Sequence, residues 1–180
     1  MTPADDLIRE LERTRDETLR CFSLGESELN RTYGPGRWSV RFLLHHLADS
    51  ECVLLERVKR VISEPRQVLW VYDQDAWALG LDYARLPLEL SKPLYEAARA
   101  ANIHLAGRHY QRDGAREWVH SVTGLRTLKD EMDKVASHNE HHWLRSGWPY
   151  RRADAGACAK SALWRISTSV HRVEASCDLP

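Results

Sequence analysis

The longest helical pattern in the sequence covers Ser39–Ile62, which reads SVRFLLHHLADSECVLLERVKRVI. Its apolar residues recur every three or four positions, the spacing that places them on one face of a helix. Ser39 is a favourable N-cap, and Pro65 follows the pattern at a point where a helix would stop. The sequence therefore predicts a helix from Val40 to about Ile62 with one buried face.

Three further stretches have the same spacing. A helix capped by Thr2 is expected to run to Leu24, a second to span Leu88–His109, and a third to run from Leu125 to about Ser146. The expected inward face of the middle one is Leu90, Leu94, Ala97, Ala101 and Leu105. Four helices of about 20 residues each predict an all-α fold, a four-helix bundle.

Two segments permit several interpretations. Val68–Val71 fits a short strand, a helical turn or a loop that covers the core. Residues 150–180 begin with small and polar residues and then carry a weak helical pattern, so they form either a docked helix or a tail. We therefore divide the chain into a bundle domain, 1–149, and a C-terminal extension, 150–180.

The composition excludes several classes of protein. Lys and Arg number 26 and Asp and Glu number 26 in 180 residues, so the chain lacks the basic excess of a nucleic-acid-coating protein. No apolar run is long enough to span a membrane, the N-terminus lacks a secretion signal, and the four cysteines form no C-x-x-C pair. We expect a cytoplasmic protein that binds a small-molecule substrate and neither nucleic acid nor membrane.

Nine histidines are many for this length, and His138-Asn-Glu-His-His142 is their densest group. Residues three or four apart share a helix face, so His138 can pair with His141 or with His142. With about 100° per residue and His138 at zero, the apolar stripe falls near 60–120°, His142 near 40° and His141 near −60°. We expect His138 and His142 to border the core and His141 to face solvent.

The same arithmetic for the helix over 40–62 places His46 at the edge of its apolar stripe, and His45 about 100° away, facing outward. Two helices thus each carry histidine at the margin of the buried face. Three neutral imidazoles with a free position for water are typical of a catalytic metal site. His46, His138 and His142 are the candidate ligands, although a single such histidine is more often a hydrogen-bonded residue at the core edge.

Four motifs, in this order, resemble those of the DinB/YfiT-like superfamily. They are Trp38-Ser39 with His46-Leu-Ala-Asp-Ser-Glu51, Tyr72-Asp73 with Trp77, His120 with Gly124 and Thr127-Leu128, and His138-Asn-Glu-His-His142. The resemblance implies a four-helix bundle with a divalent metal, zinc or nickel, on His46, His138 and His142. It also implies a metal-dependent hydrolase, and it points to a homodimer. Phe42 departs from the family, which usually has an acidic residue there, so Ser39 lacks a capping partner.

A hydrolase would need a general base near the ion. The candidate catalytic residues are Glu131, at about 20° on the His138 face, Asp49, three residues after His46, and His120, which precedes a turn. The simpler interpretation of Glu131 and Asp49 is an exposed side chain or a partner that orients an imidazole, and that of His120 is an ordinary loop histidine. Two alternatives use the same metal: a transferase that acts through a small thiol cofactor, and a non-enzymatic binding or stress-response module stabilised by metal.

Overall fold

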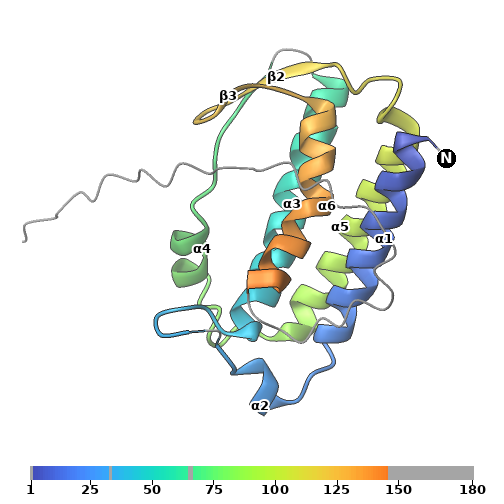
Figure 1. Ribbon diagram of the computed structural model, residues 1–180. Helices are drawn as coiled ribbons and strands as arrows, with labels where there is room; N and C mark the ends of the chain where they lie inside the picture. Colours follow the sequence, from blue (N-terminus) through green and yellow to red (C-terminus); the bar gives the residue numbers. More distant parts are fainter. Residues whose placement is uncertain (1, 33, 65–66, 146–180) are drawn as a thin grey trace, which may run out of the picture. The chain divides into compact units, whose positions relative to one another are not determined.

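The computed structural model describes residues 2–32, 34–64 and 67–145. In chain order the elements are α1 (Pro3–Cys21), α2 (Glu26–Leu29), α3 (Val40–Ser63), β1 (Val68–Leu69), α4 (Gln74–Gly80), α5 (Leu88–His109), β2 (Glu117–His120), β3 (Gly124–Thr127) and α6 (Leu128–Arg145). The long helices α1, α3, α5 and α6 run side by side, and α1 and α3 each pack against both α5 and α6 (Figure 1). The expected four-helix bundle is confirmed, and the extension 150–180 lies outside the described residues.

The helix starts follow the capping residues of the sequence. The hydroxyl of Thr2 accepts a hydrogen bond from the Asp5 amide, and the Asp5 carboxylate accepts one from the Thr2 amide, which closes a capping box at α1. At α3 the Ser39 hydroxyl accepts from the Phe42 amide at 3.3 Å, and Phe42 has no group to return the bond. α1 ends at Cys21, earlier than the predicted Leu24, because the chain turns there toward α2.

The bounds of α5 are as predicted, but the predicted inward face is wrong. Leu90 and Leu94 are 61% and 44% exposed. The buried face instead carries Ser91, Tyr95, Ala98, Arg99, Asn102 and Ala106. Arg99 Nη2 donates to Glu51 Oε2 on α3 at 2.7 Å, and Asn102 Nδ2 donates to Glu51 Oε1 at 2.8 Å. The Glu51 carboxylate thus pairs with both Arg99 and Asn102, which allows these side chains to be buried, and a stripe chosen by apolar residues alone misses them.

The core of the bundle has a buried polar layer between two apolar clusters. One cluster includes Leu11, Leu54 and Val135, and the other includes Leu44, Leu47 and Trp143. Between these positions along the four helices lie buried polar side chains: Thr14, Thr18, Glu51, Arg99, Asn102 and Asn139. The layer fixes how the helices are aligned, because each polar group requires its own partner.

A small sheet at one end of the bundle was only partly expected (Figure 1). β1 pairs in parallel with β2, and β2 pairs antiparallel with β3, so Val68–Leu69 is a strand. Gly124 has a φ of +77° at the start of β3, a backbone conformation that glycine adopts without strain. The hairpin occupies the first positions of the predicted fourth helix. α6 therefore begins at Leu128, and Leu125 is 64% exposed on β3.

No helix within the described ranges is long and apolar enough to cross a lipid bilayer.

Candidate metal centre

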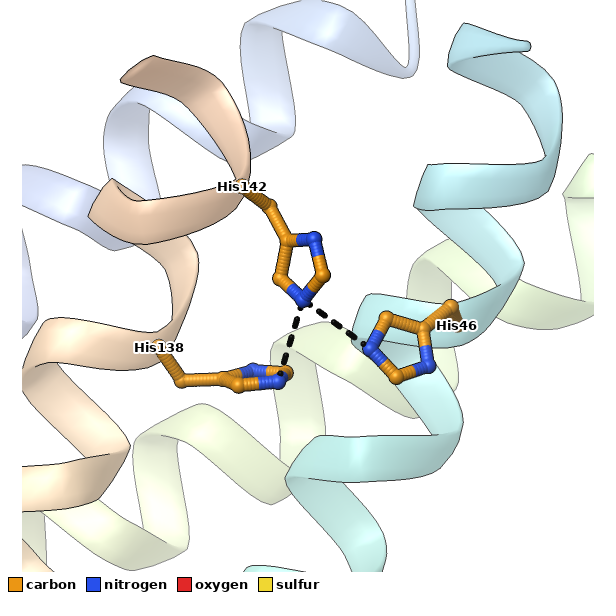
Figure 2. A group of neighbouring side chains, drawn as sticks. All are labelled: His46, His138 and His142. Carbon is orange, nitrogen blue, oxygen red and sulfur yellow. Dashed lines mark hydrogen bonds between the residues drawn. The ribbon is translucent and has the colours of Figure 1, made fainter. Parts of the chain in front are cut away.

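Three imidazoles from two helices meet in the bundle. His46 comes from α3, and His138 and His142 come from consecutive turns of α6 (Figure 2). The Nε2 atom of His142 lies 3.1 Å from Nε2 of His46 and 3.2 Å from Nε2 of His138. One ring nitrogen from each of the three lies within 4.8 Å of the others. The set predicted from helical spacing is thus brought together.

The donor atoms suit a divalent ion. Two nitrogens bound tetrahedrally to zinc at about 2.0–2.1 Å stand roughly 3.3 Å apart, close to the separations of the Nε2 pairs. Burial lowers the pKa of His46 to about 4. Burial, with a further contribution from His142 and His46, holds the pKa of His138 well below its usual range. At neutral pH these two rings are therefore uncharged and offer lone pairs, the form that binds metal.

Aromatic rings surround His46. The Trp38 ring centroid is 5.2 Å from that of His46, and the Tyr72 ring stacks on it at 6.3 Å. Trp77, which is 37% exposed, packs edge-on against Tyr72 at 4.9 Å. His46 itself is only 1% exposed behind this packing.

Sequence reasoning missed two hydroxyl groups at the site. The Tyr72 hydroxyl and the Ser50 hydroxyl each lie 3.3 Å from His46 Nδ1, and they also bond to each other. Burial raises the pKa of Tyr72 to about 12, so its hydroxyl is protonated at neutral pH. Both residues lie inside the sequence motifs that carry the family resemblance, which was the available signal.

The prediction that His45 faces outward is wrong. His45 is fully buried, its Nδ1 lies 2.7 Å from Ser91 Oγ on α5, and its ring lies 5.2 Å from that of Tyr83. A helical wheel considers one helix alone, whereas α5 and the chain around Tyr83 cover α3 on this side as well. His141 is exposed, as predicted.

The two candidate acids have partners outside the three imidazoles. Glu131 is 1% exposed and accepts a hydrogen bond from Arg57 Nη1 at 3.3 Å, so it is a buried partner of an arginine and not a surface carboxylate. Asp49 is half-buried and accepts a hydrogen bond from the Tyr83 hydroxyl, and burial raises its pKa. A catalytic role for either stays a prediction.

His120 ends β2 and faces the bundle. Its Nδ1 accepts hydrogen bonds from the amides of Val122 and Thr123, both at 3.2 Å, so one ring nitrogen stabilises the hairpin turn. Burial, with the nearby cation Arg57, lowers the pKa of His120 to about 4. Its catalytic role also stays a prediction.

The chain is thus a four-helix bundle in which two helices bring together three histidines that could hold a metal ion. Residues 10–144 match the family model of the DinB superfamily, and the chain belongs to this superfamily.

Two curated relatives from Oceanobacillus iheyensis are each named "putative metal-dependent hydrolase". One is 32% identical over 120 residues, which is 67% of this chain and 69% of the relative. The other is 33% identical over 138 residues, which is 77% of this chain and 76% of the relative.

Two solved structures share the fold. One is YfiT from Bacillus subtilis, described as "a probable metal-dependent hydrolase with an unusual four-helix bundle topology". Its TM-score is 0.72 at 24% identity, and the match covers 81% of this chain and 86% of the YfiT chain. The other is a mycothiol-dependent maleylpyruvate isomerase, with a TM-score of 0.63 at 14% identity. The match covers 81% of this chain and 61% of the isomerase chain.

Proposed function

We propose that this protein is a metal-dependent hydrolase whose divalent ion is held by His46, His138 and His142. The observation that carries the proposal is the convergence of three Nε2 atoms from α3 and α6. The names of the two Oceanobacillus relatives support hydrolysis as the reaction class. A donor set made only of imidazoles suits zinc or nickel.

The chain's own residues would bind and orient the reacting groups. The three imidazoles fill three positions around the ion and, being neutral, leave its double charge uncompensated. A bound ion of this kind would lower the pKa of a water ligand toward neutrality and polarise a substrate carbonyl or phosphoryl oxygen. Asp49, one turn after His46 on α3 and held by Tyr83, is the nearest candidate in sequence to accept a proton.

Hydrolysis of a model ester, p-nitrophenyl acetate, tests the proposal. The metal-loaded protein should hydrolyse it faster than the chelated protein, and adding zinc or nickel back should restore the rate. His138→Ala should abolish the metal-dependent rate, whereas His141→Ala, which changes an exposed histidine on the same helix, should keep it. Equal rates for chelated and metal-loaded protein would contradict the proposal.

A second candidate is the transfer of a small thiol in the same pocket. The fold that the chain shares with a mycothiol-dependent isomerase supports it. Burial raises the pKa of Cys21 to about 11, and burial also raises the pKa of Cys52. Neither of these two cysteines, which are the ones within the described residues, is a ready thiolate, and this favours a thiol supplied by a cofactor.

Monochlorobimane distinguishes the two candidates. Metal-dependent conjugation of this electrophile to glutathione or mycothiol would favour thiol transfer. Ester turnover without any thiol would favour hydrolysis. Metal binding without turnover in either assay would favour the non-enzymatic module.

A further inference from the structure

The segment between β1 and α4 brings a side chain to the back of a candidate ligand. The Tyr72 hydroxyl lies 3.3 Å from His46 Nδ1, on the ring nitrogen that does not face the other two histidines. Ser50, one turn after His46 on α3, places its hydroxyl 3.3 Å from the same nitrogen and within hydrogen-bonding contact of Tyr72. The Ser50 hydroxyl also lies 3.3 Å from His46 Nε2, so the Tyr72 hydroxyl is the contact specific to Nδ1, and Ser50 holds that hydroxyl in place.

The segment that carries Tyr72 is anchored on two sides. Arg57 Nη2 donates to the carbonyl oxygen of Trp70 at 2.7 Å, and the Ser121 hydroxyl accepts from the Val71 amide at 2.9 Å. Arg57 is in turn paired with Glu131, and the two side chains are 3% and 1% exposed. The position of Tyr72 is thus set by the protein before any ion binds.

His46 needs such support more than the other two ligands do. His138 and His142 lie four residues apart on α6, so one helix turn sets their spacing. His46 comes from a different helix and has to meet them with the correct nitrogen. An imidazole binds metal through Nε2 only when the proton is on Nδ1, and the group that accepts this proton selects the tautomer.

We propose that Tyr72, together with Ser50, is a positioning residue that fixes the tautomer and ring orientation of His46 for metal binding. The Nδ1 proton of His46 is donated to the Tyr72 oxygen, and Tyr72 donates its own proton to the Ser50 oxygen. This inference rests on the proposed metal site. It does not depend on whether the reaction is hydrolysis or thiol transfer.

Cobalt binding tests the inference without an activity assay. Tyr72→Phe removes the hydroxyl and keeps the ring that packs on Trp77. We expect the affinity for Co²⁺, measured by competition with a chelator, to fall by about 10-fold or more. The visible absorption spectrum of bound Co²⁺ should change because His46 is less well oriented. Without metal, the melting temperature of Tyr72→Phe should stay near that of the metal-free wild type.

Two further variants complete the test. Ser50→Ala should weaken Co²⁺ binding in the same direction. Tyr110→Phe removes a tyrosine hydroxyl that donates to Asp133 at 2.7 Å and should leave the affinity and the spectrum unchanged. If the wild type binds no Co²⁺, the proposed metal site itself is overturned. If the wild type binds Co²⁺ and both Tyr72→Phe and Ser50→Ala match its affinity and spectrum, the positioning role is overturned and the metal site stands.

Discussion

The Nε2 atoms of His46 and His142 lie 3.1 Å apart, although the two residues are 96 positions apart in the chain. Their meeting depends on the alignment of α3 and α6 in the bundle, and polar contacts beside the candidate ligands tie α6 to the neighbouring helices α1 and α5. Asn139, directly after His138, donates to Thr18 Oγ1 on α1 at 3.1 Å and to the Tyr95 hydroxyl on α5 at 2.6 Å. The buried polar layer therefore adjoins the candidate metal centre, and its contacts hold the turn of α6 that carries His138.

Removal of metal should lower the melting temperature. An ion that binds only the folded protein contributes about 2.7 kcal/mol at a free concentration one hundred times its Kd. For a domain of this size that corresponds to a rise in Tm of about 5–10 °C. Calorimetry of chelated and zinc-loaded protein measures the shift. His138→Ala should show no shift in Tm on addition of zinc. A wild-type Tm that does not change at saturating zinc would contradict the proposed site.

The Glu51–Arg99 pair should be essential for stability. Both side chains are at most 1% exposed and their closest atoms are 2.7 Å apart. Arg99→Met leaves the Glu51 carboxylate buried without its cation, which should cost about 3–5 kcal/mol. Urea unfolding gives the free energy of unfolding of each variant.

An exposed ion pair provides the matched control. Arg85 and Asp82 are 88% and 51% exposed, and water already solvates both groups. Arg85→Met should change the free energy of unfolding by roughly 0–1 kcal/mol. A loss for Arg99→Met as small as that of this control would show that the polar layer does not hold the bundle.

His120 should contribute to acid sensitivity. Burial, together with Arg57, Lys134 and Arg126, lowers its pKa from 6.5 to about 4. The folded state therefore binds fewer protons than the unfolded state between these values. The contribution of uncharged His120 to the free energy of unfolding is therefore fully present above about pH 6.5, and it is lost as the pH falls toward about 4.

Urea unfolding of chelated wild type and His120→Asn, at about pH 7.5 and about pH 4.5, isolates this contribution. Asparagine keeps an acceptor for the turn amides and cannot be protonated in this range. The free energy of unfolding should fall further between the two pH values in the wild type than in the variant. Equal losses in both proteins would show that His120 does not titrate as described.

The two candidate acids should behave differently. Asp49→Asn should lower kcat for the model ester by about 10²–10⁴-fold if Asp49 is the general base, with metal content unchanged. Glu131→Gln should mainly lower the melting temperature, because its carboxylate is occupied by Arg57 in a buried pair. A fall in kcat for Glu131→Gln at full stability and full metal content would reverse these assignments.

The sequence predicted the features that depend on one helix at a time. The start of α3 at Val40 follows from its capping residue Ser39, and the span of α5 follows from helical spacing, and both are local signals. His138 and His142 could be paired because a single helix turn fixes their spacing. His46 could be added because it lies on the edge of its own apolar stripe.

The features that were missed depend on contacts between elements. The polar inward face of α5 is stable only because Glu51 on another helix binds Arg99 and Asn102. His45 is buried because α5 covers it. Leu125 has helical spacing but lies in a hairpin, where strand pairing overrides local propensity. Tyr72 reaches His46 through a segment with no periodic pattern.

Metal analysis of the chain, purified without a histidine tag, tests the central claim most directly. The account predicts that wild-type protein binds one divalent ion per chain, and that His46→Ala, His138→Ala and His142→Ala each lose it while His141→Ala keeps it. The contrary result is a folded wild-type protein that takes up no zinc, nickel or cobalt, or three alanine variants that retain the ion as well as the wild type does.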